Sequence, residues 1–423
     1  MQPRAVADLG PAGRAALFER DAGIDDAREG AREIAARVRE EGDVALREYA
    51  REFDDVEVGN LDVTDQAERA WESLDGSVRE AIETAIRNVR AFHERQVPED
   101  WRDSFDGREL GRRFRPLERV GVYVPGGRAA YPSSAIMGVV PAIVAGVDHV
   151  AVCTPPAKPL NPVTLGAIHR AGADRVYQVG GAQAVAALAY GTETVNAVQK
   201  IVGPGNRFVA AAKAAVRGDV AIDFIAGPSE LLVVADGSAD PDLVAADMLA
   251  QAEHDTDAAV ACVTDDPDLA AAVAAACEQQ AGEREREATI RGALAGDASG
   301  VFLARSASEM VLFAEEYAAE HLSILAEDDE ALLERITNAG SVFLGPYTPV
   351  AGGDYATGTN HVLPTGGAAR TEGGLSVDTF LRSSTVQRLD RSALAELRET
   401  VTRLADAEGL EAHAASVEAR FED

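Results

Sequence analysis

Cysteine is scarce in this chain, and the few cysteines present exclude a disulfide framework. Cys153, Cys262 and Cys277 are far apart in 423 residues, and no Cys-x-x-Cys pair occurs. Scattered thiols are typical of proteins that stay in a reducing compartment. The first residues also lack the basic segment and apolar run of a secretory signal. We therefore expect a cytoplasmic location.

Long apolar runs are missing as well. The longest uncharged stretch, residues 129–147, is interrupted by Pro132, Gly138 and Pro141. A membrane-spanning helix needs about 20 predominantly apolar residues. We therefore expect no membrane span.

Positive charge is the third shortage. Lys and Arg total 40 against 71 Asp and Glu, which gives a net charge of −31, and the only lysines are Lys158, Lys200 and Lys213. Such a surface repels phosphate backbones and anionic lipids, so we expect neither nucleic-acid nor membrane partners. Carboxylates stay hydrated at high salt, where repulsion is screened within about 3 Å at 1 M. We interpret the bias as salt adaptation; an acidic protein from an ordinary environment is the alternative.

Short apolar strands alternate with helices from residue 119 onward, and most of them end at glycine or proline. The strands are expected at 120–124, 149–153, 175–179, 200–202 and 220–223. This alternation predicts a doubly wound, mostly parallel sheet, in which ligands bind at the carboxyl ends of the strands. A second α/β region has expected strands at 230–235, 258–263 and 341–344. The predicted fold class is α/β, with two incomplete Rossmann-like doubly wound domains.

Helices are expected at both ends of the chain. Apolar residues from Trp71 to Phe92 recur every three or four positions, which predicts one helix with Thr64 or Asp65 as its N-cap. Beyond about Ser376 the chain is charged and predicted to be helical. We therefore expect small helical appendages at the N- and C-termini.

Two of the seven histidines stand beside residues that could share their chemistry. His254 follows Gln251 by three positions near the end of a predicted helix, so both side chains could bind one metal ion. Glu320 and His321 are adjacent, and on a helix they would diverge by about 100° and serve separate proton transfers. A solvated charged helix is the alternative for this pair. Structural roles are expected for the histidines at positions 93, 149 and 169, the first on an exposed helix end.

A long irregular segment, residues 343–367, is expected to be functional because long loops within compact domains usually are. It contains Asp354 and His361, and the carboxylate of Asp354 could complete a zinc site begun by histidine. His413 lies on the C-terminal appendage and gains a role only if that helix docks on a site, for example in a partner subunit. Cys153 is expected to be structural, because no nearby cation would activate its thiol.

The usual dinucleotide fingerprint is absent. No Gly-x-Gly-x-x-Gly follows any expected strand, and Gly203-Pro-Gly205 continues with Asn206 rather than the fingerprint spacing. The glycine-rich turns could bind a dinucleotide by other contacts, although their spacing does not establish it.

A series of segments, in order along nearly the whole chain, resembles the histidinol dehydrogenase family. The segments are Val120-Gly-Val-Tyr-Val-Pro-Gly-Gly127, Val179-Gly-Gly-Ala-Gln-Ala184, Ile201-Val-Gly-Pro-Gly-Asn206, Ala226-Gly-Pro-Ser-Glu230, Gln251-Ala-Glu-His254, Ala319-Glu-His-Leu322, Gly353-Asp-Tyr-Ala356 and Thr359-Asn-His-Val-Leu-Pro-Thr365. The family consists of zinc-containing homodimers that oxidise L-histidinol through L-histidinal to L-histidine with two NAD+, the last step of histidine biosynthesis. The family lacks the dinucleotide fingerprint too.

The resemblance implies a role for each matching residue. The implied zinc ligands are Gln251, His254, Asp354 and, from the other subunit of a homodimer, His413. The implied proton acceptors are Glu320 and His321, and the implied NAD+ contacts are Tyr123, Gln183 and Asn206. The substrate pocket is implied to contain the zinc ligands together with Ser229, His321, His361 and Glu408. The two C-terminal residues are placed only by Ala407-Glu-Gly-Leu-Glu-Ala-His413.

These assignments lead to an expected domain organisation. Residues 1–22 would form an N-terminal helical extension, and 23–119 would join 230–375 in the α/β domain with the metal and proton-transfer residues. Residues 120–229 would form the NAD+-contacting α/β domain, and 376–423 would be the helical domain that reaches the partner subunit.

Two other functions remain open. A relative in the same superfamily could oxidise a different alcohol, such as a sulfonated diol, but His413 and Glu408 favour histidinol. A zinc-dependent hydrolase could use Glu320 to activate water without a nucleotide, but the glycine-rich strand ends favour a dehydrogenase.

Overall fold

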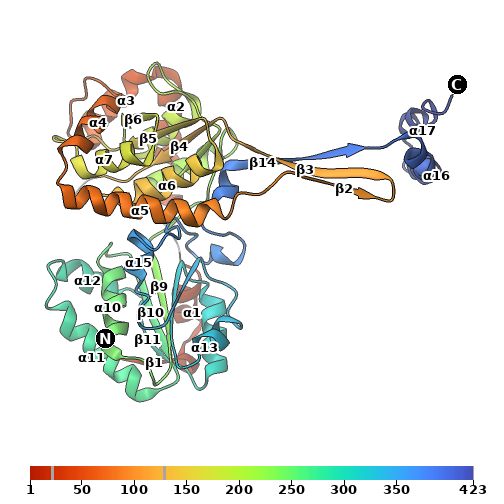
Figure 1. The fold of residues 1–423 in the computed structure, drawn as a ribbon. Helices are drawn as coiled ribbons and strands as arrows, with labels where there is room; N and C mark the ends of the chain where they lie inside the picture. Colours follow the sequence, from red (N-terminus) through yellow and green to blue (C-terminus); the bar gives the residue numbers. More distant parts are fainter. Residues whose placement is uncertain (21–22, 127–129, 423) are drawn as a thin grey trace. The chain divides into compact units, whose positions relative to one another are not determined.

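The computed structural model describes residues 1–20, 23–126 and 130–422 and divides into two compact units (Figure 1). The first unit comprises residues 1–96 and 117–380, and the second comprises residues 97–116 and 381–423. Within the described ranges, no helix has both the length and the apolar composition needed to cross a membrane.

One half of the first unit is built on a five-stranded parallel sheet with strand order β6-β5-β4-β7-β8. The strands are β4 (Arg119–Tyr123), β5 (His149–Thr154), β6 (Arg175–Gln178), β7 (Lys200–Val202) and β8 (Ala221–Ile222). The connecting helices are α6 (Pro132–Ala145), α7 (Pro162–Ala171), α8 (Gly181–Tyr190) and α9 (Arg207–Val216). The strand order reverses between β4 and β7, which is where a doubly wound sheet binds ligands.

The other half is built on a six-stranded parallel sheet with strand order β1-β11-β10-β9-β12-β13. The strands are β1 (Arg4–Ala5), β9 (Glu230–Ala235), β10 (Ala259–Thr264), β11 (Gly300–Leu303), β12 (His321–Leu325) and β13 (Ser341–Leu344). Its helices are α1 (Pro11–Phe18), α10 (Pro241–Ala252), α11 (Pro267–Ala281), α12 (Glu287–Ala295), α13 (Ala307–Tyr317), α14 (Asp329–Leu333) and α15 (Val350–Tyr355). The predicted pair of doubly wound α/β sheets is therefore confirmed.

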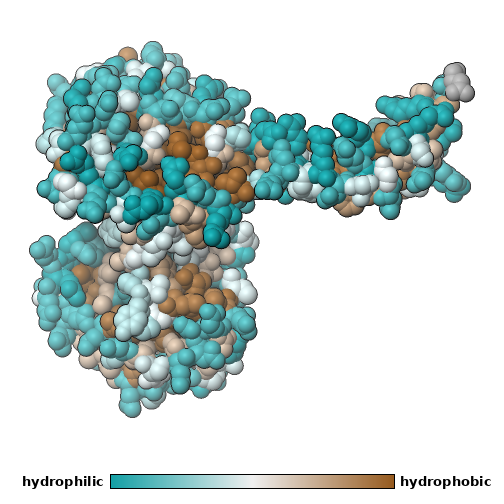
Figure 2. All heavy atoms as spheres, viewed as in Figure 1, coloured by the Kyte–Doolittle hydropathy of each residue, from teal (hydrophilic) through white to brown (hydrophobic). Residues whose placement is uncertain are grey.

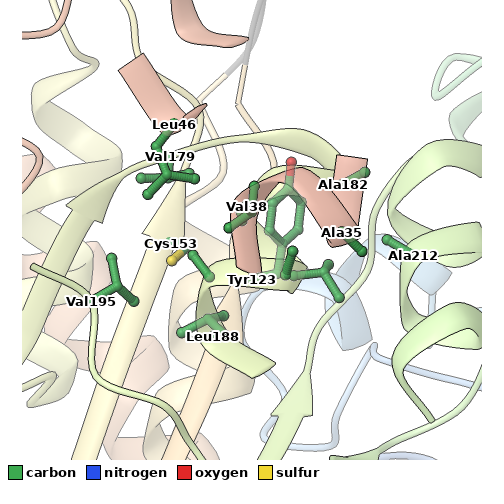
Figure 3. Close-up of a cluster of buried hydrophobic side chains, with 14 of the residues drawn as sticks. Ala35, Val38, Leu46, Tyr123, Cys153, Val179, Ala182, Leu188, Val195 and Ala212 are labelled. Atoms are coloured by element: carbon green, nitrogen blue, oxygen red, sulfur yellow. The ribbon is translucent and has the colours of Figure 1, made fainter. Parts of the chain in front are cut away.

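The N-terminal helices pack differently from the predicted grouping. We expected residues 23–119 to join 230–375, but these helices pack against the five-stranded half: α2 contacts α8 and α9, α4 contacts α7, and α5 contacts α6. Ala35 and Val38 of α2 lie in the same core as Tyr123 and Cys153 (Figure 3). Small side chains on α2 let the helices approach closely, which periodicity alone does not reveal. The bounds are α2 (Ile24–Glu41), α3 (Asp43–Phe53), α4 (Thr64–Ser73) and α5 (Gly76–Glu94).

The single helix predicted over residues 71–92 is two helices, α4 and α5. Asp75 ends the continuity because it is the N-cap of α5, and its side chain accepts the N–H two residues later at 2.8 Å. The two residues predicted as caps lie inside α4, directly after its cap residue Val63.

The N-terminal segment is not a purely helical extension. β1 pairs with β11 at the edge of the six-stranded sheet, and α1 packs on α13. Val6, Leu17 and Phe18 are buried in the core of that half. The predicted extension, residues 1–22, is therefore part of this half as far as Arg20; its last two residues lie outside the described ranges.

The second unit contains a strand that the sequence interpretation missed. β14 (Leu381–Arg388) pairs antiparallel with β3 (Arg108–Pro116), and β3 pairs with β2 (Trp101–Phe105). The prediction of a wholly helical C-terminal segment was wrong here, because β14 is largely solvent-exposed and lacks the apolar alternation that marks a half-buried strand. Helices α16 (Arg391–Ala407) and α17 (Glu411–Glu418) pack on each other. Hydrophilic residues cover much of the visible face of this unit (Figure 2).

Candidate active site

Glu320 and His321 lie where α13 gives way to β12. Ala318, in the left-handed conformation with φ 48°, is the C-cap of α13, and the chain then pairs with β9 and β13. The prediction that both residues lie on a helix was wrong. They also do not diverge: His321 Nδ1 is 3.4 Å from Glu320 Oε2.

The peptide groups of Glu230, at the start of β9, hold both side chains. The Glu230 N–H donates to Glu320 Oε2 at 2.7 Å, and the Glu230 carbonyl oxygen lies 3.0 Å from His321 Nδ1. A hydrogen on Nδ1 would donate to this carbonyl and leave Nε2 as the ring's basic nitrogen. His321 Nε2 is buried and has no hydrogen-bond partner among the described residues. The contact at Nδ1 therefore fixes the ring and leaves Nε2 available for a further hydrogen bond.

Asp354 faces that nitrogen from α15, a short helix inside the segment predicted to be irregular. Asp354 Oδ1 is 3.6 Å from His321 Nε2, and the Asp354 carbonyl oxygen lies 2.9 Å from Nδ1 of His361. Burial raises the pKa of Asp354, but the close approach of His321 and the charges of the three nearby histidines, including His254, lower it overall. Burial lowers the pKa of His321, but Glu320 and Asp354 outweigh that effect and raise it to about 10.

Gln251 and His254 meet at the end of α10. The Gln251 side chain is in the last turn, His254 lies just beyond the helix, and Gln251 Nε2 is 3.3 Å from His254 Nδ1. Gln251 is only 2 % exposed, and its Oε1 is buried without a hydrogen-bond partner in the described part of the chain. An amide oxygen buried in this way needs a donor or a cation.

The donor set fits a zinc ion in part. Gln251, His254 and Asp354 offer oxygen and nitrogen atoms, and the Gln251 oxygen is the buried one described above. Residues 1–20, 23–126 and 130–422 contain no group of three or more His, Cys, Asp or Glu side chains arranged to hold a metal ion. Of the three residues, only His254 and Asp354 are of these types, because Gln251 is an amide. A tetrahedral ion would need a further ligand.

Other predicted substrate residues lie in different places. His361 follows α15, and its Nε2 is 3.4 Å from Ser134 Oγ at the start of α6. Ser229 immediately precedes β9, and its carbonyl oxygen accepts the Ala259 N–H at 3.0 Å. Glu408 is the C-cap of α16 and His413 lies on α17; both belong to the second unit and are exposed.

The predicted NAD+ contacts gather at the carboxyl edge of the five-stranded sheet. Tyr123 ends β4 and is buried, which raises the pKa of its hydroxyl, and that oxygen accepts the Gly181 N–H at 3.1 Å. Gln183 is buried in the first turn of α8. Asn206 is the N-cap of α9, with Oδ1 accepting two backbone N–H groups at 3.1 and 3.2 Å. Helix N-termini at this edge suit an anionic cofactor.

One glycine of the motifs is explained by its close packing. Gly203 has φ +112°, and a Cβ there would lie 2.2 Å from the Tyr123 carbonyl oxygen. Only glycine allows β4 and the turn after β7 to approach this closely. Gly127 of the first motif lies outside the described residues.

The sequence interpretation missed Glu230 and misplaced His93. A charged residue at the head of the apolar strand Glu230–Ala235 is a signal for a buried, paired carboxylate. His93 was expected at an exposed helix end but is fully buried, with Nδ1 2.7 Å from the Val89 carbonyl oxygen, and burial lowers its pKa. Cys153 is buried in the core, which supports its expected structural role.

Comparison with known proteins places this arrangement in a family. The family model described as histidinol dehydrogenase matches residues 19–421. Histidinol dehydrogenases of Haloarcula marismortui and Natronomonas pharaonis are each 72% identical over 422 residues, covering 100% of both chains, and that of Methanosarcina barkeri is 45% identical, covering 98% of this chain and 97% of the relative. The crystal structure of histidinol dehydrogenase from Elizabethkingia anophelis has a TM-score of 0.94 and 34% identity, covering 100% of this chain and 98% of that chain. The chain therefore belongs to the histidinol dehydrogenase family.

Proposed function

We propose that this protein oxidises L-histidinol through L-histidinal to L-histidine, with two NAD+ as hydride acceptors and one zinc ion per subunit. The observation that carries the proposal is a cluster of residues that are far apart in the sequence: His321 Nε2 lies 3.6 Å from the partly buried Asp354 carboxylate, and Asp354 interacts with the charge of His254, which contacts Gln251. Within the described chain, His321 Nε2 and Gln251 Oε1 are buried without a hydrogen-bond partner. Family membership supports the substrate.

The zinc would be held by Gln251, His254 and Asp354, with His413 of the partner subunit as the fourth ligand in a homodimer. When bound, zinc supplies a positive charge that anchors the imidazole and amine of the substrate. Ser229, His361 and the partner subunit's Glu408 would complete the pocket. The net attraction of such a cation for Asp354 would also weaken the hold of that carboxylate on a proton at His321.

His321 and Glu320 would handle the protons of the two oxidations. In the first, His321 Nε2 takes the hydroxyl proton while the carbon-bound hydride leaves to NAD+. Water then adds to histidinal, and Glu320 accepts a proton from that water. The hydrated aldehyde then loses a second hydride to the second NAD+ while His321 Nε2, which has released its first proton to solvent, takes the remaining hydroxyl proton, and this forms the carboxylate. The Glu230 peptide, which contacts both side chains, keeps His321 Nε2 directed into the site.

The nucleotide would lie at the carboxyl edge of the five-stranded sheet, near Tyr123, Gln183 and Asn206. Because Tyr123 and Asn206 also hold the N-terminal turns of α8 and α9, they would shape the surface on which the cofactor rests. The remaining proposals are a cytoplasmic location, supported by three scattered free cysteines, and salt adaptation, supported by the few lysines and the net charge of −31.

The test is the yield of NADH from a limiting amount of L-histidinol with excess NAD+, followed by its ultraviolet absorbance. Two NADH per histidinol are expected, and chelation should abolish the signal until zinc is restored. No NADH from histidinol, but zinc-dependent hydrolysis or oxidation of another alcohol, would replace this proposal with one of the alternatives.

A further inference from the structure

A buried ion pair lies directly behind Glu320 and His321. Arg20 donates from Nε to Glu230 Oε1 at 2.7 Å and from Nη2 to Glu230 Oε2 at 2.9 Å. The two side chains are only 8% and 3% exposed. This bidentate geometry is the strong form of an arginine–carboxylate interaction.

Arg20 is itself held by the elements around it. Nη2 also donates to the Tyr317 carbonyl oxygen at 2.8 Å, Nη1 donates to the Leu17 carbonyl oxygen, and the guanidinium lies 4.0 Å from the centre of the Tyr317 ring. Arg20 therefore connects the end of α1, the end of α13 and the start of β9. The chain enters β12 only a few residues after Tyr317.

Glu230 links Arg20 to the candidate active site through its side chain and its peptide groups. Its carboxylate also accepts the Gly366 N–H at 2.7 Å, in the segment that follows His361. Its backbone N–H and carbonyl group contact Glu320 and His321. Burial raises the pKa of the Glu230 carboxyl, while the charge and hydrogen bonds of Arg20 oppose that rise. Without Arg20, an uncompensated carboxylate would remain buried close to Glu320.

We propose that Arg20 is a positioning residue for the reaction, acting through Glu230 to fix the orientations of Glu320 and His321. The inference rests on the proposed function. The N-terminal segment contributes no group to the proposed metal or cofactor contacts, yet through Arg20 and Glu230 it would affect turnover.

The experiment compares the zinc-loaded full-length protein with its Arg20→Ala and Arg20→Lys variants. In Arg20→Ala, kcat should fall about 10- to 100-fold, as for groups that orient metal-site residues, while KM for NAD+ and zinc content stay within about twofold. Arg20→Lys should be intermediate, because an ammonium keeps the charge but not the two-pronged geometry. Added guanidinium ion should restore part of the activity of Arg20→Ala, and an equal concentration of KCl should not.

Arg14→Ala is the matched control. Arg14 is on α1 in the same segment, pairs with Glu316 and lies 5.1 Å from the centre of the Phe18 ring, but is 41% exposed and makes no contact with Glu230. Its kcat should stay within about twofold of the wild type, as for an exposed pair.

The outcomes separate the two proposals. Wild-type protein that forms no NADH from histidinol would overturn the proposed function and this inference with it. Active wild type with Arg20→Ala turning over equally fast would overturn the inference alone, as would an activity loss that follows zinc loss and is not rescued by guanidinium. If Arg20→Ala does not fold, Glu230→Gln decides: a lower kcat in a folded, zinc-containing variant supports the inference, and an unchanged kcat overturns it.

Discussion

The two parallel sheets of the first unit are both doubly wound, but their candidate functional residues lie at opposite edges: the carboxyl edge of one sheet and the amino edge of the other. In the five-stranded sheet β4 lies at the centre, with β5 and β6 on one side and β7 and β8 on the other. In the six-stranded sheet β9 has the same position, with β10 and β11 on one side and β12 and β13 on the other. The five-stranded sheet places Tyr123 and the turn before Asn206 at its carboxyl edge, as the general rule for such sheets expects. The six-stranded sheet places Glu230 and His321 at its amino edge.

This difference shows that shared topology does not determine where a site forms. The proposed NAD+ site at the carboxyl edge would use the glycine turns and helix N-termini that doubly wound sheets commonly provide there. The amino-edge site depends on contacts specific to this chain, in particular the Glu230 peptide and the approach of Asp354 from α15. Variants at the two edges should therefore fail in different ways.

The largest effect is expected from His321→Asn, at the amino edge. This change removes the nitrogen proposed to accept the hydroxyl proton, so both oxidations should slow by about 10³-fold or more. Single-turnover measurement of NADH from histidinol and from histidinal would show it. His169→Asn, on the last turn of α7, is the control and should keep full activity. Near-normal turnover of His321→Asn would exclude the proposed role.

A smaller and selective effect is expected from Glu320→Gln. The amide keeps the acceptor oxygen for the Glu230 N–H but cannot take a proton, so histidinal oxidation should slow by about 10²-fold and histidinol oxidation much less. Steady-state rates with each substrate separate the two steps. Equal losses would refute the division of roles and would fit the 3.4 Å contact between Glu320 and His321 acting as one relay.

The carboxyl edge is tested by Gly203→Ala. The added Cβ would meet the Tyr123 carbonyl oxygen at 2.2 Å in a backbone region that favours glycine, so the turn must shift. We expect KM for NAD+ to rise about tenfold, a loss of about 1.4 kcal/mol, while zinc content is unchanged. Gly218→Ala is the control, because no atom of the described residues lies within 4 Å of a Cβ added there. A rise in KM for histidinol alone would contradict the assignment of this edge.

The last effect leaves catalysis unchanged and is a pH-dependent change in stability at Asp54, which lies in contact range of the five-stranded half. Burial raises its pKa from 3.8 to about 6, and it lies at the C-terminal end of α3, where a negative charge is unfavourable. Because the folded-state pKa is the higher one, ionising Asp54 costs stability above pH 6, and the cost disappears as the pH falls toward 4.

Asp54→Asn should therefore stabilise the protein at pH 7 by about 1–2 kcal/mol and have little effect near pH 4. Chemical unfolding of both proteins at the two pH values measures this difference. A stabilisation of the same size at both pH values would show that ionisation of Asp54 is not its cause.

Much of the fold was predictable because it depends on local patterns. Apolar strands followed by glycine or proline identified both sheets, and the three-residue spacing of Gln251 and His254 predicted their contact. Which helices and strands pack together depends on contacts between distant parts of the chain and was not predictable. Nothing near residue 24 indicates that α2 packs on α8 and α9, and the exposed β14 has no pattern that separates it from a charged helix.

The residues of the candidate site could be predicted only where they belong to one of the sequence motifs. Glu320 and His321 were selected from the sequence as a pair, but their helical placement and divergence were wrong, because a strand of five residues after α13 is too short to show a period. Arg20 and Glu230 were missed because their pairing joins residues 210 positions apart. Charge complementarity over that distance cannot be read from one sequence.

The three-stranded ribbon of β2, β3 and β14 has a consequence for the order of folding. Arg112 of β3 and Ser383 of β14, which are hydrogen-bonded, are 271 positions apart. During translation the β2–β3 hairpin therefore emerges long before its third strand, and an isolated hairpin is only marginally stable. Nascent chains must carry an open β-edge until synthesis is almost complete, and any chain released before residue 381 would keep β3 without its third-strand partner.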